Sequence, residues 1–77
     1  AERLTDGDPA IRAMRAEAMA RAADGQVTIP VRELVTEILA QNPVEPRAMF
    51  LSGLAAYQDE DYGVAVAIWR RLQSLSA

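Results

Sequence analysis

Residues 46–75, PRAMFLSGLAAYQDEDYGVAVAIWRRLQSL, decide the fold of this chain. Apolar side chains recur at helical spacing on both sides of an acidic turn at 59–61, which predicts one helix near residues 46–58 and another near 61–75. A glycine inside a helix costs about 1 kcal/mol relative to alanine, so Gly53 is expected at a close helix contact, beside Trp69 or Ala65. The second helix is expected to turn inward Tyr62, Ala65, Val66, Trp69, Leu72 and Leu75.

The first half of the chain predicts another pair of helices, near residues 9–23 and 29–41. Asp8 and Pro9 suit a helix start, Gly25 suits a break with positive φ, and Thr28 is placed to cap the next helix. The helix near 9–23 is expected to pack through Ile11, Met14, Ala18 and Ala22. The helix near 29–41 has the clearest amphipathic spacing, at Val31, Leu34, Val35, Ile38 and Leu39. Prolines at 43 and 46 separate the two pairs. We therefore predict an all-α fold of two consecutive antiparallel helical hairpins, without a strand.

The composition limits the size of the core and the chemistry of the chain. With 77 residues, 51% of them hydrophobic and many of these alanine, residues 1–77 fit a single domain with a thin core. The chain has no cysteine and no histidine, which removes thiolate nucleophiles, disulfides and the usual zinc ligands. No convergent set of carboxylates or arginines has an interpretable catalytic spacing. We expect a non-enzymatic protein without cofactor or metal.

Charge and hydropathy narrow the class of partner. Eight basic residues against eleven acidic ones give a net charge of -3, the wrong sign for gripping a phosphate backbone. No apolar run approaches the roughly 20 residues that span a bilayer, and residues 1–8 lack the regions of a signal peptide. We expect no nucleic acid partner and no membrane contact of this chain itself. An anchor elsewhere in a longer protein stays open.

The two predicted hairpins superpose at an offset of 34 residues, the period of tetratricopeptide repeats. The pairs matched at this offset are Val31 with Ala65, Val35 with Trp69, and Pro43 with Ala77. Residues 49–77 resemble such a repeat, because Met49, Gly53, Ala65 and Trp69 fit the pattern W-x2-L-G-x2-Y followed by A-x3-F. The positions that depart from the pattern are Ser52, Ala56 and Ala77, and the helical signature is missing in the first hairpin. The resemblance implies an α-solenoid with a degenerate repeat at 9–43 and a second repeat at 46–77.

Three stretches carry a narrower resemblance: GQVT at 25–28, NPVEPRAMFLSG at 42–53, and the segment 61–72 with Asp61-Tyr62, Ala65 and Trp69-Arg70-Arg71-Leu72. Together they resemble the C-terminal repeat domain of the bacterial cytochrome c biogenesis tetratricopeptide family (CcmI/CycH), over about residues 8–76. The resemblance implies a periplasmic, membrane-tethered parent protein. It also implies a chaperone-like adaptor that holds apocytochrome c for the haem ligation machinery.

In tetratricopeptide stacks the first helix of each hairpin lines a concave surface on which a peptide lies. By this resemblance, the peptide-binding residues are Arg47, Phe50, Leu54, Tyr57 and Gln58. Aromatic side chains would pack against a guest helix, and Arg47 would meet a carboxylate. The alternative is that the apolar members of this set pack against Val35, Ile38 and Leu39 of the preceding helix. A module that joins subunits without a peptide guest is the competing function.

The remaining polar and aromatic features have structural interpretations. Trp69 is expected to pack beside Gly53 rather than bind a ligand. Arg12, Arg15 and Arg21 form either a basic strip for an acidic partner or a solvated face paired with Glu17 and Asp24. Asp59, Glu60 and Asp61 lack the spaced ligands of a calcium loop, so a solvated turn is expected there.

The apolar end of the last helix predicts a covering neighbour. Repeat arrays normally have at least about three units and polar caps, whereas two hairpins are predicted here and no charged residue follows Arg71. Further repeats, a preceding segment, or a second copy packed isologously would cover this end. A homo-oligomer is therefore one expected arrangement.

Overall fold

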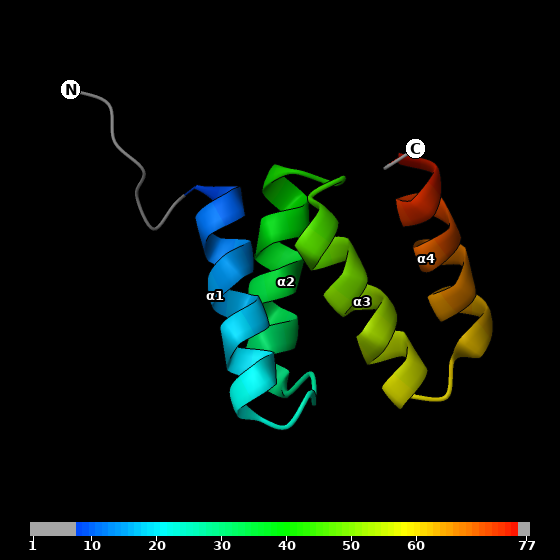
Figure 1. Ribbon diagram of the computed structural model, residues 1–77, viewed down its shortest axis with the longest axis horizontal. Helices are drawn as coiled ribbons and strands as arrows, with labels where there is room; N and C mark the ends of the chain where they lie inside the picture. Colours follow the sequence, from blue (N-terminus) through cyan, green and yellow to red (C-terminus); the bar gives the residue numbers. More distant parts are fainter. Residues whose placement is uncertain (1–7, 76–77) are drawn as a thin grey trace.

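The computed structural model describes residues 8–75, which form four helices and no strand. They are α1 (Pro9–Ala22), α2 (Ile29–Gln41), α3 (Pro46–Gln58) and α4 (Tyr62–Leu75), each antiparallel to the next (Figure 1). The predicted all-helical class is confirmed, and the predicted bounds differ from these by one residue at most. Residue 77, the expected end of the second hairpin, lies outside the described residues.

Two of the helix starts use an acidic residue followed by proline. The carboxylate of Asp8 accepts a hydrogen bond from the Ala10 N–H at 2.8 Å, and the carboxylate of Glu45 accepts one from the Ala48 N–H at 3.0 Å. Each satisfies a backbone donor that has no partner within the helix. Thr28 precedes α2, but its side chain makes no cap hydrogen bond, so that prediction was wrong. Pro30 at the second helical position has no N–H to donate, and the Thr28 side chain does not bond the Val31 N–H at the third position either.

The predicted positive φ at Gly25 is confirmed, at 83°. Asp24 at 59° and Glu60 at 63° are also left-handed, which the sequence did not indicate because neither is glycine or asparagine. In both turns a backbone hydrogen bond of 2.8 Å closes the helix end, from the Gly25 N–H to the Ala20 carbonyl and from the Asp61 N–H to the Ala56 carbonyl.

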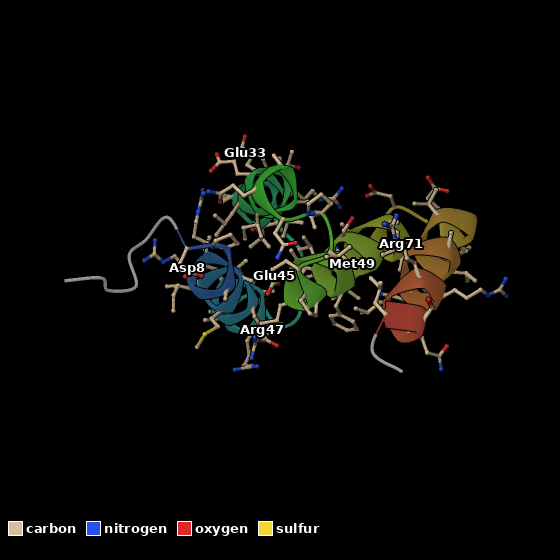
Figure 2. All side chains as sticks on the ribbon, turned by 90° about the horizontal axis from the view of Figure 1, so that it is seen from above. Asp8, Glu33, Glu45, Arg47, Met49 and Arg71 are labelled. Carbon is tan, nitrogen blue, oxygen red and sulfur yellow. The ribbon has the colours of Figure 1, made fainter. Side chains whose placement is uncertain are left out.

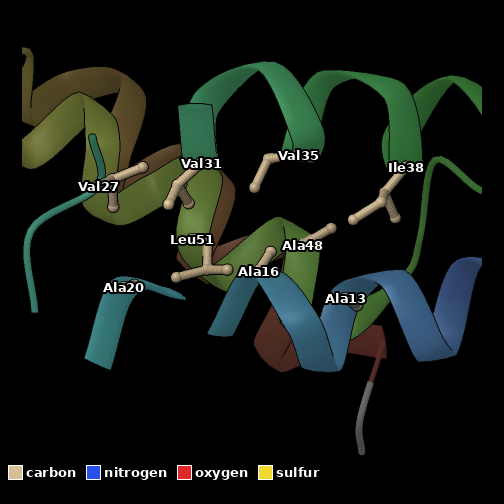
Figure 3. Close-up of a cluster of buried hydrophobic side chains, with 9 residues drawn as sticks. All are labelled: Ala13, Ala16, Ala20, Val27, Val31, Val35, Ile38, Ala48 and Leu51. Atoms are coloured by element: carbon tan, nitrogen blue, oxygen red, sulfur yellow. The ribbon is translucent and has the colours of Figure 1, made fainter. Parts of the chain in front are cut away.

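Helix α3 is the central element. Among the described helices, α1, α2 and α3 all contact one another, whereas α4 contacts only α3. Seen from above, α3 fits beside the pair formed by α1 and α2 and carries α4 on its other side (Figure 2). Ala48 and Leu51 of α3 point into the space between α1 and α2 (Figure 3). The core that results is small, and its buried members are Ala13, Ala16, Ala20, Val27, Val31, Val35, Ile38, Ala48 and Leu51.

The predicted packing face of α1 was wrong. Met14 is 50% exposed and Ala18 and Ala22 are exposed, whereas three alanines at 13, 16 and 20 are buried. This orientation also brings the guanidinium of Arg12 to Glu37, with which it pairs, and to the Gln41 amide oxygen, to which it donates at 3.0 Å, both on α2. Periodicity favoured the larger apolar side chains, but the alanine face permits a closer approach of the helices.

The close approach predicted at Gly53 is confirmed. A Cβ atom at this position would lie within 2.8 Å of the Nε1, Cδ1 and Cε2 atoms of Trp69. Ala65, one turn before Trp69, is 1% exposed. The inward direction predicted for three other residues of α4 was wrong, since Tyr62, Val66 and Leu75 are each about half exposed, at 52%, 47% and 51%. A helix that packs on a single neighbour buries only one narrow strip.

A polar joint fixes the connection between α1 and α2 against the end of α3. The Val27 N–H donates to Gln58 Oε1 at 2.7 Å, and Gln58 Nε2 donates to the Val27 carbonyl at 3.3 Å. Arg32 on α2 donates to both carboxylate oxygens of Asp59, at 2.7 and 2.9 Å, and to the Val27 carbonyl at 3.2 Å. The hydrogen bond between the two charged groups raises the pKa of Arg32 and lowers that of Asp59, against the opposing effect of burial.

We predict that Gly53→Ala destabilises the fold, because the added methyl group overlaps the indole of Trp69. Overpacking of this kind typically costs about 1 to 3 kcal/mol. Gly63→Ala is the matched control: a Cβ there meets nothing within 4 Å, so a gain of about 0.5 to 1 kcal/mol is expected. Thermal unfolding followed by circular dichroism and by the fluorescence of the single tryptophan measures both. Equal melting temperatures for the parent and Gly53→Ala would contradict the contact.

We predict that Asp59→Asn lowers the melting temperature at neutral pH and leaves it nearly unchanged in strong acid. Because Arg32 lowers the pKa of Asp59 below its ordinary 3.8, the ion pair stabilises the fold fully above about pH 4 and is lost as the pH falls through the lower folded value. Glu33→Gln is the control, since it removes an equal charge from the exposed side of α2. A melting difference between Asp59→Asn and the parent that persists at about pH 2 would refute the assignment to this ion pair.

Candidate functional site

An open groove of about 530 Å³ runs between α1 and α3. Its apolar lining comes from α1 through Ala20 and from α3 through Phe50, Leu51 and Leu54, with Pro46 at one end. Its charged lining comes from Glu17, Arg21, Asp24 and Arg47. The groove exists because α1 and α3 lie side by side through small residues, while their larger side chains diverge toward solvent. A surface of this kind holds apolar side chains of a guest and offers both charge signs at its edges.

Three of the five predicted site residues line this groove: Arg47, Phe50 and Leu54. They are brought together because positions separated by three and four residues share one side of a helix. Figure 2 shows Arg47 on the side of α3 next to α1, away from Glu33 on the far side of α2. Leu54 is partly buried against the core, while Phe50 is 48% exposed. The packing alternative therefore describes Leu54 better than Phe50.

An ion pair crosses the groove edge. Arg47 Nε donates to Glu17 Oε1 at 3.2 Å, and Arg21 Nη2 lies 3.8 Å from the other oxygen of the same carboxylate. All three side chains are well exposed, so the pairs contribute little stability. Glu17 thus holds two arginines at the edge of an apolar surface, where a guest carboxylate would compete with it. The expected pairing of Glu17 with Arg21 is present, whereas Arg12 pairs with Glu37 instead.

Tyr57 does not line the groove but belongs to an aromatic cluster shared by α3 and α4. Its ring lies 5.2 Å from that of Tyr62, edge to face, and 6.1 Å from that of Trp69. Phe50 lies 6.1 Å from Trp69 with nearly parallel rings, and Trp69 Nε1 donates to the Phe50 carbonyl at 3.4 Å. The chain has one Phe, one Trp and two Tyr, so this cluster contains all of its aromatic residues. The rings of Phe50, Tyr57 and Tyr62 remain about half exposed.

Gln58, the fifth predicted site residue, also lies away from the groove. Its amide is occupied by both backbone groups of Val27, which is 2% exposed. The groove residues that were not among the predicted peptide-binding residues are Glu17, Ala20, Arg21, Asp24, Gly25, Pro46 and Leu51. Those on α1 were missed because this helix was assigned the wrong packing face. Within residues 8–75, no cluster of three or more acidic side chains is suited to hold a metal ion.

Comparisons with known proteins show what this chain is similar to. No family model and no solved structure matches it. None of the helices in residues 8–75 is long and apolar enough to span a bilayer. The chain is similar to a cytochrome c-type biogenesis protein, CycH, of Pseudomonas aeruginosa, with 28% identity over 75 residues that cover 97% of this chain and 18% of that protein.

Proposed function

We propose that this chain is a polypeptide-binding module of tetratricopeptide type that acts in cytochrome c maturation. The observation that carries the proposal is the apolar groove between α1 and α3, open to solvent and edged by paired charges. The stretches 25–28, 42–53 and 61–72 resemble a family with this role, and the similar protein is named for cytochrome c-type biogenesis. Since the chain spans 18% of that relative, the module would supply one part of a larger protein's activity.

The repeat assignment is supported by the way α3 and α4 meet. Gly53 and Ala65 let these helices approach, and Trp69 fills the space beside them. The same relation holds in the first pair, where the alanine face of α1 lies against Val31 and Val35 of α2. In each pair the first helix faces the groove. This is the arrangement in which tetratricopeptide repeats present a concave binding surface.

The chemistry of the groove suits a segment of polypeptide better than a small polar metabolite. Phe50 and Leu54 offer apolar surface over little more than one turn of helix, and burial of one large apolar guest side chain contributes about 1.5 to 3 kcal/mol. The charged edge sets the direction of the guest by pairing with its own charges. Apocytochrome c, presented to the haem ligation machinery by a periplasmic, membrane-tethered parent, is the guest that the resemblance suggests. We assign no enzymatic role.

An assembly module without a guest is the second candidate. The half-exposed aromatic rings of Tyr57 and Tyr62 favour it, because neither residue lines the groove. Such rings are common at protein interfaces.

We predict that the chain binds apocytochrome c and that Leu54→Ser weakens binding by roughly tenfold, the loss expected when about 1.4 kcal/mol of apolar contact is removed. Ile29→Ser is the matched control, since Ile29 is 71% exposed on α2 and does not line the groove. Fluorescence anisotropy of labelled apocytochrome c measures both dissociation constants, and melting curves confirm that each variant is folded. Equal affinities for the two variants would remove the groove from the binding site. If the unsubstituted 77-residue chain does not bind apocytochrome c, the proposed guest is refuted.

A further inference from the structure

The two antiparallel helix pairs can be aligned with each other along the sequence. Asp8-Pro9 begins α1 as Glu45-Pro46 begins α3, which places the first helices at an offset of 37 residues. The second helices match at an offset of 34, where the buried Val31 corresponds to the buried Ala65. The difference is explained by the connections, residues 23–28 in the first pair and 59–61 in the second, because the latter is three residues shorter. Each residue of α3 is therefore aligned with a residue of α1, and each residue of α2 with a residue of α4.

The contact between the two pairs is made by one stripe of α3. Ala48 and Leu51 are 0% and 3% exposed between α1 and α2, and Ala55 packs against the same core (Figure 3). The equivalent stripe on α1, at the offset of 37, is Ile11, Met14 and Ala18. Met14, at 50%, and Ala18 are exposed, and Ile11 is partly exposed. Helix α1 thus has the apolar stripe of a helix that docks on a preceding pair.

The surface that receives α3 also has an equivalent. It is built by Ala13 and Ala20 of α1 and by Val35 and Ile38 of α2. The corresponding positions on α3 and α4 are Phe50, Tyr57, Trp69 and Leu72. Phe50 and Tyr57 are 48% and 53% exposed, and Trp69 and Leu72 are partly exposed. The equivalents of the two contacting surfaces therefore lie at opposite ends of the row of helices, one on α1 and the other on α3 and α4 (Figure 1).

The polar part of the internal contact has complementary equivalents as well. Arg32, which pairs with Asp59 inside the chain, corresponds to Val66, and Asp59 corresponds to Ala22, so an ion pair is replaced by two apolar residues. Val66 is 47% exposed and Ala22 is exposed. Gln58, whose amide binds the backbone of Val27, corresponds to Arg21, and Val27 corresponds to Asp61. Arg21 and Asp61 are exposed and have opposite charges.

We propose that copies of this chain associate head to tail, with the outer stripe of α1 from one copy docking on the exposed face of α3 and α4 of another. The contact uses the positions equivalent to those through which α3 docks on α1 and α2 inside each copy, with the larger Phe50 and Tyr57 in place of Ala13 and Ala20. It joins two different surfaces, so it is heterologous and adds copies in a row instead of closing an isologous dimer. Apolar residues meet in its centre, and Arg21 faces Asp61 at its edge.

Complementary single-face variants of the 77-residue chain test this arrangement. Met14→Glu blocks the α1 stripe and Val66→Glu blocks the α4 face, and both sites are about half exposed, so the fold should be kept. In light scattering up to about 1 mM, which detects a millimolar dissociation constant, the parent should grow beyond a dimer with concentration. Each variant alone should remain at 8.4 kDa, and an equimolar mixture should form a one-to-one dimer through the two unblocked faces.

Ile29→Glu is the control for an added charge at an exposed apolar site outside both faces, and it should associate like the parent. Circular dichroism confirms helix content in every variant. A parent that stays monomeric, a single variant that still dimerises, or a mixture that stays monomeric overturns the proposal. Leu54→Ser separates this result from the proposed function, because it should weaken guest binding and keep self-association.

The charge pair gives a second prediction. Arg21→Glu and Asp61→Arg should each weaken association by placing like charges together, and their mixture should restore it by reversing the pair between copies. Restoration in the mixture, measured by sedimentation at low salt, requires that the two positions face each other across the contact. Equal association of the single variants and the mixture would exclude this orientation.

Discussion

The seating of α3 between α1 and α2 is the interaction on which the rest of the structure depends. It requires Ala13, Ala16 and Ala20 on α1, because larger side chains there would hold the helices apart, and it buries Ala48 completely. Since α3 is the one described helix that touches the other three, its sides define every surface discussed above. One side forms the groove with α1, another carries the aromatic cluster with α4, and its end binds the Val27 connection.

The helices could be predicted from the sequence because their limits are set locally. An acidic residue before proline begins α1 and α3, and the Pro43 region and the acidic turn end α2 and α3. The orientation of α1 could not be predicted in the same way, since periodicity gives weight to large apolar side chains. It depends on distant contacts, both the packing of the alanine face in the core and the bonds of Arg12 to Glu37 and Gln41, which are 25 and 29 residues away.

The candidate site could be predicted where helical spacing decides it, and could not be predicted where contacts between distant segments decide it. Arg47, Phe50 and Leu54 share one side of α3 by helical geometry alone, so their neighbourhood in the groove followed from spacing. Tyr57 and Gln58 continue that side in the sequence, but contacts with other segments turn them away. Tyr57 meets the rings of Tyr62 and Trp69, and Gln58 is held by a backbone 31 residues earlier.

The two proposals meet at these same residues. At the offset of 37, Tyr57 and Gln58 on α3 are the equivalents of Ala20 and Arg21, which line the groove on α1. In a head-to-tail row, the α3 helix of one copy and the α1 helix of the next would stand as α1 and α3 stand within a copy. Tyr57 would then lie at a second groove, formed between two copies. Self-association would extend the surface offered to a polypeptide, because a repeat array lengthens its binding face with every unit that is added.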